Sequence, residues 1–318
     1  ANITNNQIQT NPSAPSRALV SDSNGYLQTS TTTAAEIGYV NGVTSSIQAQ
    51  LNGIASKNFL PQGEFRYNPN TILNFITLTG VNTDTWLALG VSIIQTSAAR
   101  YTVTMSTDVP TIAAAGKNIA RSIKLDLTTA DASIAAGDHS SLRLCTGGPN
   151  AIYLNNTAMT LSFWIKTTIT GTYCVSFRNP GDQGATNGSA YIAEYTVSSA
   201  NTWEYKTITV TTPASYPSAI GVEPNPGLVV AFAFCCGSTN QATAGSWQSS
   251  GISNASILAT SNQVNALSSA ANDIFFADIR LQPGVVDKAT ISPLASEIAN
   301  LCYYWVQGGQ VKTAGAQT

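Results

Sequence analysis

Apolar and polar residues alternate with a period of two in several segments of the chain. In residues 161–166 the odd positions are apolar, and in residues 206–210 the even positions are. Because successive side chains of a strand point to opposite faces, this period is typical of strands with one buried face. Both segments are therefore predicted to be half-buried β-strands.

Two further segments extend this pattern. Residues 228–236 alternate large apolar side chains with small ones, which predicts a strand covered on both faces. In residues 275–281 the odd, apolar positions are expected to point one way, and Asp278 and Arg280 the other. Turn-forming residues separate these runs, and no long helical pattern lies between them. The sequence therefore predicts a mainly β fold, an antiparallel jelly-roll β-sandwich, over residues 58–318.

The chain ahead of this β-rich region has a different pattern. Residues 1–32 hold few large apolar side chains and many turn formers, so we expect them to form an extended anchoring arm. From Thr33 onward, residues recur at spacings of three and four in the a/d pattern of a short coiled coil. These residues are Ile37, Val40, Thr44, Ile47, Leu51 and Ile54. Residues 33–57 are thus predicted to form a helical oligomerisation stem.

The stem pattern leaves two points open. Asn41-Gly42 is a turn dipeptide, so two short helices fit the pattern as well as one rod does. Isoleucine at d positions disfavours a dimer, and we expect a homotrimer. The residues expected to hold it are Ile37, Val40, Ile47, Leu51 and Ile54. The alternative is that the helices pack on the chain's own body, because most helical stability comes from tertiary packing.

Composition narrows the classes of partner. Hydrophobic residues make up 43% of the 318 residues, which is enough for a core, but charged residues make up only 9% and the net charge is -2. Such a chain has no basic surface for nucleic acid. The longest apolar run, residues 228–236, is far shorter than the ~20 residues that span a bilayer. The surface must therefore be hydrated mainly through uncharged polar groups. Because few charges would lose their hydration when subunits pack together, we interpret this composition as that of an assembly protein.

The five cysteines are not spaced as metal ligands. They are Cys145, Cys174, Cys235, Cys236 and Cys302, without a CxxC pair among them. We expect buried, free thiols in a reducing cytoplasm, with Cys235 and Cys236 on opposite faces of a strand. The polar start ANITNNQIQT has no apolar segment typical of a secretory signal, so synthesis and retention in a cytoplasm are expected.

Several segments, in order, resemble the carbohydrate-binding-module-like jelly-roll domains of bacteriophage tail-fibre and other virion surface proteins. They are NFL at 58–60, GEF at 63–65, TDTW at 83–86, TLSFWIK at 160–166, TGTYCVSFRN at 170–179, NTWEYKTITV at 201–210, GSWQ at 245–248, IRLQPG at 279–284 and EIANLCYYW at 297–305. Residues 33–52, TAAEIGYVNGVTSSIQAQLN, resemble the short helical repeat that precedes the receptor-binding region of phage tail fibres.

The chain departs from this family at two places. Cys302 leads directly into Tyr303-Tyr304, where the family has an arginine. The loop before GSWQ has no acidic residue that would help to place a calcium ion, so no metal site and no cofactor are expected.

Candidate catalytic residues are few, and we expect no enzyme. Asp138, His139 and Ser140 are consecutive residues, which cannot readily point at one another in relay order, and a solvated turn is the simpler interpretation. Glu194 and Glu204 could be the carboxylate pair of a glycan depolymerase, although two exposed strand carboxylates are the simpler interpretation. Neither GxxxxGK[ST] nor GxGxxG occurs in the sequence.

Sugar binding is the remaining chemistry that the sequence supports. Aromatic faces that stack on sugar rings, next to polar groups, are expected at Trp164, Arg178, Tyr191 and Tyr195. The alternative is that these aromatic residues pack against a second sheet or a neighbouring subunit.

The resemblance and the residue patterns together predict a structural virion protein. It is expected to be a homotrimeric fibre subunit on the virion surface, at the tail or the head, that contacts other virion proteins through its N-terminal arm. It is also expected to engage host surface polysaccharide without inserting into a membrane. The alternative is a head-fibre or decoration (cement) protein that stabilises the shell.

Overall fold

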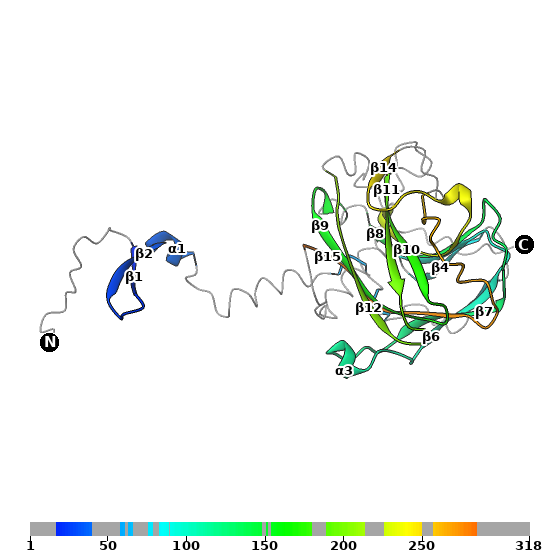
Figure 1. Cartoon of the computed structure of the whole chain (residues 1–318), viewed down its shortest axis with the longest axis horizontal. Helices are drawn as coiled ribbons and strands as arrows, with labels where there is room; N and C mark the ends of the chain where they lie inside the picture. Colours follow the sequence, from blue (N-terminus) through cyan, green and yellow to red (C-terminus); the bar gives the residue numbers. More distant parts are fainter. Residues whose placement is uncertain are drawn as a thin grey trace, which may run out of the picture. The chain divides into compact units, whose positions relative to one another are not determined.

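The computed structural model describes residues 17–39, 58–60, 63–65, 76–78, 83–88, 90–147, 151, 154–179, 189–213, 226–249 and 257–284. The chain forms two compact units, residues 1–54 and 55–318, and Figure 1 shows the elements of each. Among the described residues no helix is long and apolar enough to cross a membrane.

The first unit is a small hairpin followed by one turn of helix. Strands β1 (Arg17–Ser21) and β2 (Leu27–Thr33) pair antiparallel, and helix α1 (Ala34–Gly38) starts directly after β2. The Asp22 carboxylate closes the turn by accepting hydrogen bonds from the amides of Asn24 at 2.9 Å and Tyr26 at 2.8 Å. The segment expected to be an extended arm therefore contains a hairpin, because its turn formers lie between two runs that can pair.

Helix α1 begins at a capping box. The Thr33 hydroxyl accepts a hydrogen bond from the amide of Glu36, and the Glu36 carboxylate accepts one from the amide of Thr33. Ile37 of the predicted stem lies in this helix. The other residues expected to hold the trimer, Val40, Ile47, Leu51 and Ile54, lie outside the described residues.

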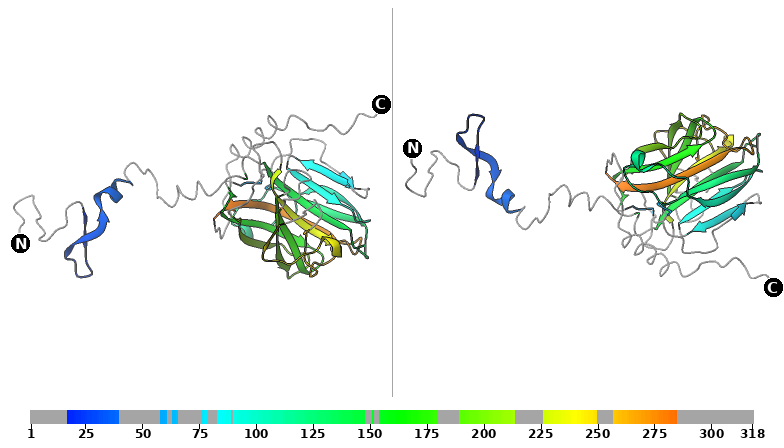
Figure 2. Two further views of the ribbon diagram at one scale, coloured as in Figure 1. Left: turned by 90° about the horizontal axis from the view of Figure 1, so that it is seen from above. Right: turned by 90° about the horizontal axis from the view of Figure 1, so that it is seen from below.

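The second unit is an antiparallel jelly-roll β-sandwich of two sheets, whose two layers are seen in Figure 2. The seven-stranded sheet has the order β14 (Trp247–Ser249), β11 (Ser189–Val197), β10 (Gly171–Asn179), β13 (Pro226–Cys236), β8 (His139–Gly147), β5 (Val91–Gln95) and β4 (Thr83–Ala88). The six-stranded sheet has the order β12 (Glu204–Thr211), β9 (Ala158–Thr167), β15 (Asp273–Pro283), β7 (Ser122–Thr129), β6 (Arg100–Ser106) and β3 (Ile76–Leu78). Short helices α3 (Ile112–Ala115) and η2 (Ser238–Asn240) lie in connections.

The main core lies between the two sheets. Phe163 of β9, Phe232 of β13 and Phe276 of β15 are fully or almost fully buried there. The Phe163 ring meets the Phe232 ring edge-on at 4.9 Å between centroids, and the Phe232 and Phe276 centroids are 4.7 Å apart. Edge-on and tilted pairs of this kind add to the area that the rings bury. The predicted inward face of residues 161–166 is confirmed.

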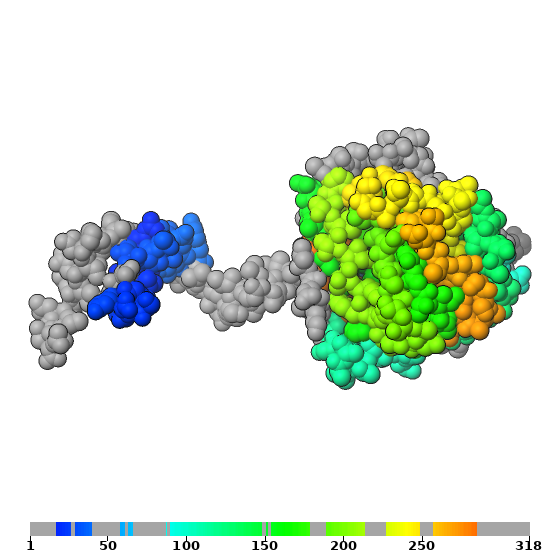
Figure 3. Space-filling view, in the orientation of Figure 1, coloured from blue at the N-terminus to red at the C-terminus, as the bar shows by residue number. Residues whose placement is uncertain are grey.

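Strand β13 is covered on both faces, as its sequence predicted. Its large residues face the main core, whereas Val229, Ala231 and Ala233 form a second apolar cluster on the outer face with Leu258 and Ala259. Residues 257–260 cover this face and form backbone hydrogen bonds with residues 240–242. Both segments belong to the yellow-to-orange part of the chain in Figure 3. Small side chains on β13 let this segment approach the sheet closely.

The alternation predicted for residues 275–281 is confirmed for Ile279 and Leu281 but wrong for the residues before Asp278. A β-bulge between Ala277 and Arg280, with Asp278 at φ +50°, shifts the register against β9. Before the bulge Phe276 faces the main core, and after it Ile279 does. Ala277 lies on the outer face. The extra residue of a bulge makes one strand change phase, which a strict period of two cannot represent.

The described cysteines are buried, and Cys174, Cys235 and Cys236 are free thiols. Cys235 lies in the main core and Cys236 in the outer cluster, so their predicted opposite orientation is confirmed. Cys145 and Cys174 also belong to the outer cluster. Burial raises the pKa of the Cys236 thiol to about 12, so this thiol stays protonated. Cys302 lies outside the described residues.

Candidate functional site

A group of aromatic and charged side chains lies on the outer face of the six-stranded sheet. We call it the Trp203 surface. It consists of Asp108, Trp164, Lys166, Trp203, Tyr205 and Phe275, which come from β9, β12, β15 and the loops at residues 107–121 and 198–203. Alternation along β9 turns Trp164 and Lys166 away from the core that Phe163 enters.

Strand pairing places the aromatic rings side by side. Tyr205 is directly opposite Trp164, and their ring centroids are 5.2 Å apart. Trp203 meets Phe275 edge-on at 6.1 Å. Trp203 and Tyr205 are half-buried, so part of each ring remains available to solvent. Trp164 is buried, and both Trp203 and Tyr205 pack against the cluster that contains it.

The loop that joins β6 to β7 covers the remainder of Trp164. Ile119 is buried against Trp164 and Ala277, and Val109 and Ala115 pack on the same cluster. Helix α3 in this loop starts with the Thr111 hydroxyl as its cap and ends at Gly116 in the left-handed conformation, φ +69°. The covering loop therefore leaves Trp203 and Tyr205 as the exposed part of the aromatic cluster.

Lys166 and Asp108 fix the exposed tryptophan. The indole nitrogen of Trp203 donates to a carboxylate oxygen of Asp108 at 3.0 Å, and the Lys166 ammonium pairs with the other oxygen. The same ammonium lies 5.5 Å from the centre of the Trp203 ring and 4.4 Å from that of Phe275. Burial raises the pKa of Asp108, but the hydrogen bonds from Lys166 and Trp203 outweigh it and lower the pKa overall.

The outward positions of β12 continue the surface with hydroxyl groups. Thr207 and Thr209 follow Tyr205 at every second residue and are exposed. They lie opposite Ser162 and Thr160 of β9, and the hydroxyls of Thr160 and Thr209 are 3.1 Å apart. Aromatic faces followed by neutral hydroxyls can stack on the C–H faces of a sugar ring and hydrogen-bond its hydroxyls.

The structure does not bring together the four residues expected to bind sugar. Trp164 belongs to the Trp203 surface, but Arg178 is buried on β10, in the other sheet. Tyr195 is buried in the main core, where its ring is 5.1 Å from that of Phe163. Tyr191 is half-buried at the edge of the sandwich, 5.6 Å from Trp247. Of the four, only Trp164 belongs to the Trp203 surface.

The consecutive residues Asp138, His139 and Ser140 cannot act as a relay. The Ser140 hydroxyl turns into the core and lies 2.8 Å from that of Tyr101, whereas His139 faces outward and contacts the Thr96 hydroxyl at 3.0 Å. His139 and Ser140 are buried in β8, so the expected solvated turn is wrong for these two residues. Their alternation in a strand keeps the two side chains on opposite faces.

Glu194 and Glu204 each hold a local turn or segment in place. Glu194 is exposed on β11 and accepts hydrogen bonds from the Thr260 hydroxyl and from Asn262 at 3.1 Å. Glu204 accepts from the amides of Ser198 at 2.8 Å and Ser199 at 2.7 Å. Burial raises the pKa of Glu204, but Lys206 and these amides outweigh it and lower the pKa, so Glu204 is unsuited to be a general acid near neutral pH.

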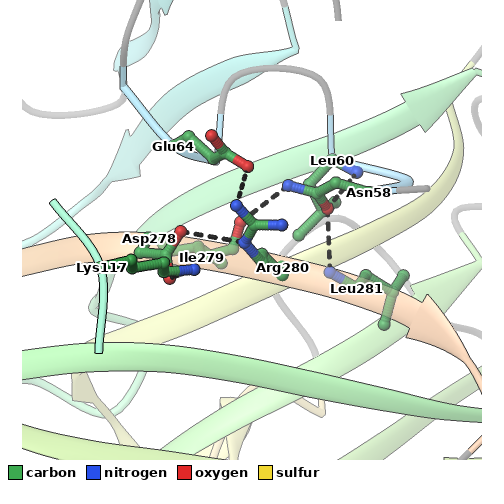
Figure 4. A network of polar contacts seen from close by, with 8 residues as sticks. All are labelled: Asn58, Leu60, Glu64, Lys117, Asp278, Ile279, Arg280 and Leu281. Atoms are coloured by element: carbon green, nitrogen blue, oxygen red, sulfur yellow. Dashed lines mark hydrogen bonds and ion pairs between the residues drawn. The ribbon is translucent and has the colours of Figure 1, made fainter. Parts of the chain in front are cut away.

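A buried ion network lies near the Trp203 surface and fastens two distant segments (Figure 4). Arg280 is fully buried and pairs with Glu64 and, at 2.9 Å, with Asp278. Lys117, from the loop that carries α3, pairs with Asp278 at 2.6 Å. Burial is the main cause of the lowered pKa of Lys117, and the charge of Asp278 opposes it. The network thus holds residues 63–65, β15 and the covering loop together.

Backbone contacts complete this fastening. Asn58 donates to the carbonyl of Ile279 at 3.0 Å and accepts from the amide of Leu281 at 3.0 Å. A Cβ atom at Gly63 would lie 1.9 Å from the carbonyl oxygen of Ile279, so only glycine fits there. Three of the segments that carry the family resemblance, residues 58–60, 63–65 and 279–284, therefore meet in space.

Trp203 and Tyr205 were not singled out from the sequence, although they lie in the quoted segment 201–210. The signal was present, because Tyr205 occupies an odd position in a strand whose even positions 208 and 210 face the core, and Trp203 continues the odd phase just before that strand. The group of Lys117, Glu64 and Arg280 gave no such signal. Its members are distant in sequence, and the bulge at Asp278 that brings them together has no marker of its own.

Comparisons with known proteins give matches to solved structures alone. No family model and no curated protein matches the sequence. Among solved structures, the enzymatically active domain of tailspike protein 4 of bacteriophage CBA120 is similar over 73% of the chain, with 16% identity and a TM-score of 0.34. The chain covers only 22% of that domain's length.

Two sugar-related structures show a similar degree of likeness. A putative sugar-binding protein from Bacteroides thetaiotaomicron is similar over 72% of the chain and 100% of its own length, with 9% identity and a TM-score of 0.35. A family 11 carbohydrate-binding module from Clostridium thermocellum, in complex with a mixed-linked tetrasaccharide, is similar over 70% of the chain and 100% of its own length, with 8% identity and a TM-score of 0.31. These identities and TM-scores are too low for the matches to assign a function.

Proposed function

We propose that this chain is a non-catalytic structural protein of a virus particle, a homotrimeric fibre subunit that engages host surface glycans through its β-sandwich. The observation that carries the binding half is the Trp203 surface, in which Trp203 and Tyr205 are half-exposed on the outer face of a sheet. The virion half rests on the ordered sequence segments that resemble phage tail-fibre domains.

The Trp203 surface has the physical properties that a sugar-binding platform needs. Its rings are fixed before any ligand arrives, since Asp108 and Lys166 hold the indole of Trp203 and Trp164 supports Tyr205. A ring that is already ordered loses little conformational entropy when a ligand stacks on it. Three identical surfaces in a trimer would raise the avidity for a repeating polysaccharide.

Assembly and attachment follow from the N-terminal part of the chain. The stem residues Ile37, Val40, Ile47, Leu51 and Ile54 supply the trimer seam, and the residues before them attach the subunit to other virion proteins. The subunit is placed on the virion surface. Cryo-electron microscopy of whole particles tests this placement, because density at the tail supports a receptor-binding fibre and density over the capsid lattice supports a decoration protein instead.

Glycan binding is tested with the full-length protein on an array of host-derived polysaccharides. Trp203→Ala is expected to lower the affinity for the bound glycan by about tenfold or more, because one stacked aromatic contributes about 1–3 kcal/mol in comparable platforms. Trp247→Phe, which changes a half-buried tryptophan at the edge of the other sheet, is the matched control and is expected to bind as the wild type does. Equal binding by all three proteins would exclude the Trp203 surface as the glycan-binding site. An absence of binding by the wild type would exclude the proposed role in adhesion.

The same samples test the enzymatic alternative. The wild-type protein is expected to leave the bound polysaccharide uncut, as judged by its size distribution after prolonged incubation. Cleavage that disappears in Glu194→Gln or Glu204→Gln would overturn the non-catalytic proposal.

A further inference from the structure

The hairpin unit, which we define as residues 17–39, exposes apolar side chains to an unusual degree. Six large hydrophobic residues are exposed in the described part of the chain, and five of them belong to this unit. They are Leu19, Val20, Tyr26, Ile37 and Tyr39, with exposed fractions from 46% to 83%. The sixth, Ile112, lies on helix α3 of the sandwich. Such a concentration of exposed apolar groups is typical of a surface that another protein covers.

The hairpin unit also has no interior of its own. Among the side chains described in residues 17–39, none is buried. Leu19 and Val20 are consecutive residues of β1, so they point to opposite faces of the two-stranded sheet. A two-stranded hairpin without a packed face is marginally stable in water. Contacts from outside the unit must therefore supply most of its stability.

The outer strand edges of the hairpin unit also have hydrogen-bonding groups that a partner could satisfy. Strands β1 and β2 form a sheet of two strands, in the order β1-β2, so each uses one edge to pair with the other. The other edge of each presents backbone amides and carbonyls that a further strand could pair. The unit thus offers apolar groups on two faces and hydrogen-bonding groups on two edges.

The charged side chains of the unit are engaged within it. Arg17 donates to the carbonyl of Thr31, Asp22 accepts from the turn amides, and Glu36 closes the capping box at Thr33. These three are the only charged residues among positions 17–39. Because the charges of the unit are few and are held by groups of the same unit, it offers a foreign partner little complementary charge, and its exposed apolar side chains would dominate an association between identical copies.

The position of the unit in the chain points to the same partner. Helix α1 starts at Ala34, directly after β2 ends at Thr33, and Ile37 of this helix is the first residue of the a/d pattern. Any symmetric association of the stem would bring the hairpins of the copies close to its axis, because no linker separates them. Helix and hairpin would then share one interface.

We infer that the hairpin unit is an intersubunit β element that packs against the same unit of two further copies of this chain. Leu19, Val20, Tyr26, Ile37 and Tyr39 provide the contacts, and the open strand edges pair between copies. The inference rests on the proposed homotrimer and deepens it, since it assigns residues 17–32 to assembly rather than to the particle. Attachment to other virion proteins then falls to residues outside the hairpin unit.

Thiol cross-linking of the full-length protein tests this inference. Leu19→Cys chains, treated with a short bis-maleimide, are expected to cross-link to one another well above the wild-type background. Ile112→Cys is the matched control, because Ile112 is the exposed large hydrophobic residue of the sandwich and is expected to remain uncross-linked. Sedimentation of the same samples gives their oligomeric state.

The possible failures are distinguishable. If Leu19→Cys stays uncross-linked in a sample that sediments as a trimer, the hairpin unit belongs to a different partner, such as another virion protein, and the inference is overturned while the proposed fibre survives. If the wild-type protein sediments as a monomer, both the inference and the proposed trimer are overturned.

Discussion

The two units of this chain place their apolar residues in opposite ways. The sandwich encloses its large side chains between two sheets, so that Phe163, Phe232 and Phe276 are fully or almost fully buried. The hairpin unit leaves Leu19 and Tyr39 in solvent and buries none of its described side chains. Because burial of apolar area is the main favourable term in folding, the sandwich can be stable alone, whereas the hairpin unit depends on contacts from outside it.

The same difference holds for charge. In the sandwich, Arg280 is fully buried and needs Glu64 and Asp278 as partners, since an uncompensated buried charge is costly. In the hairpin unit, Arg17 and Glu36 are exposed and satisfy backbone groups of their own turn and strand. Polar contacts therefore join distant segments in one unit and only shape local structure in the other. Substitutions of these polar groups should therefore lower stability more in the sandwich than in the hairpin unit.

The largest loss is expected at the buried ion network. Arg280→Met should lower the free energy of unfolding of the sandwich by about 3–5 kcal/mol, because it removes the buried guanidinium that forms ion pairs with the Glu64 and Asp278 carboxylates. Chemical denaturation followed by tryptophan fluorescence measures this change. Arg100→Met is the matched control, since Arg100 is exposed at the start of β6, and it should leave the unfolding midpoint unchanged. Equal midpoints for the two variants would show that the network does not fasten residues 58–65.

A smaller effect should appear as a pH dependence of the sandwich. Burial is the main cause of the lowered pKa of His139, and the nearby charges of Arg178 and Arg143 lower it further. A histidine whose pKa is lowered by folding favours the native state fully above its unfolded pKa, near 6.5, and loses that contribution as the pH falls through the folded value. The melting temperature should thus decrease between about pH 7.5 and pH 5.

His139→Gln is the variant that isolates this effect, because His139 is the only histidine in the chain. Calorimetry should give a flatter pH profile for the variant than for the wild type over the same range. The hairpin unit contains no histidine, so its hydrogen exchange protection, corrected for the intrinsic rate, should not change. Identical profiles for the two proteins would mean that His139 accepts a proton without cost in the folded state.

The sequence predicted what short-range periodicity can encode. The inward faces of residues 161–166 and the double coverage of β13 follow from side-chain alternation, and both are confirmed. The phase of residues 275–277 failed because one bulge residue, Asp278, exchanges the two faces. The ion pairs of Glu64 and Lys117 with residues of β15 could not be predicted, because contacts between residues far apart in sequence produce no periodic pattern.

The predicted sugar-binding residues also differ in how well the sequence placed them. Trp164 lies between the inward-facing Phe163 and Ile165, so alternation puts it on the outer face, where it is found. Tyr195 was also expected to bind sugar, yet it lies in the main core. Residue type alone does not tell whether an aromatic ring packs inside or faces solvent, whereas its phase relative to neighbouring core residues does.

The smallest effect is expected in the hairpin unit, where Thr33→Ala removes the capping box of α1. The loss of this cap should cost about 0.5–2 kcal/mol of local helix stability, seen as faster hydrogen exchange of the amides in α1. Thr32→Ala, a change at an exposed neighbour, is the control and should leave these rates as they are. The unfolding midpoint of the sandwich should stay the same in both variants, because the hairpin unit shares none of its core. A shift of that midpoint in Thr33→Ala would show instead that the two units unfold cooperatively, and the contrast between them would then be one of exposure rather than of independent stability.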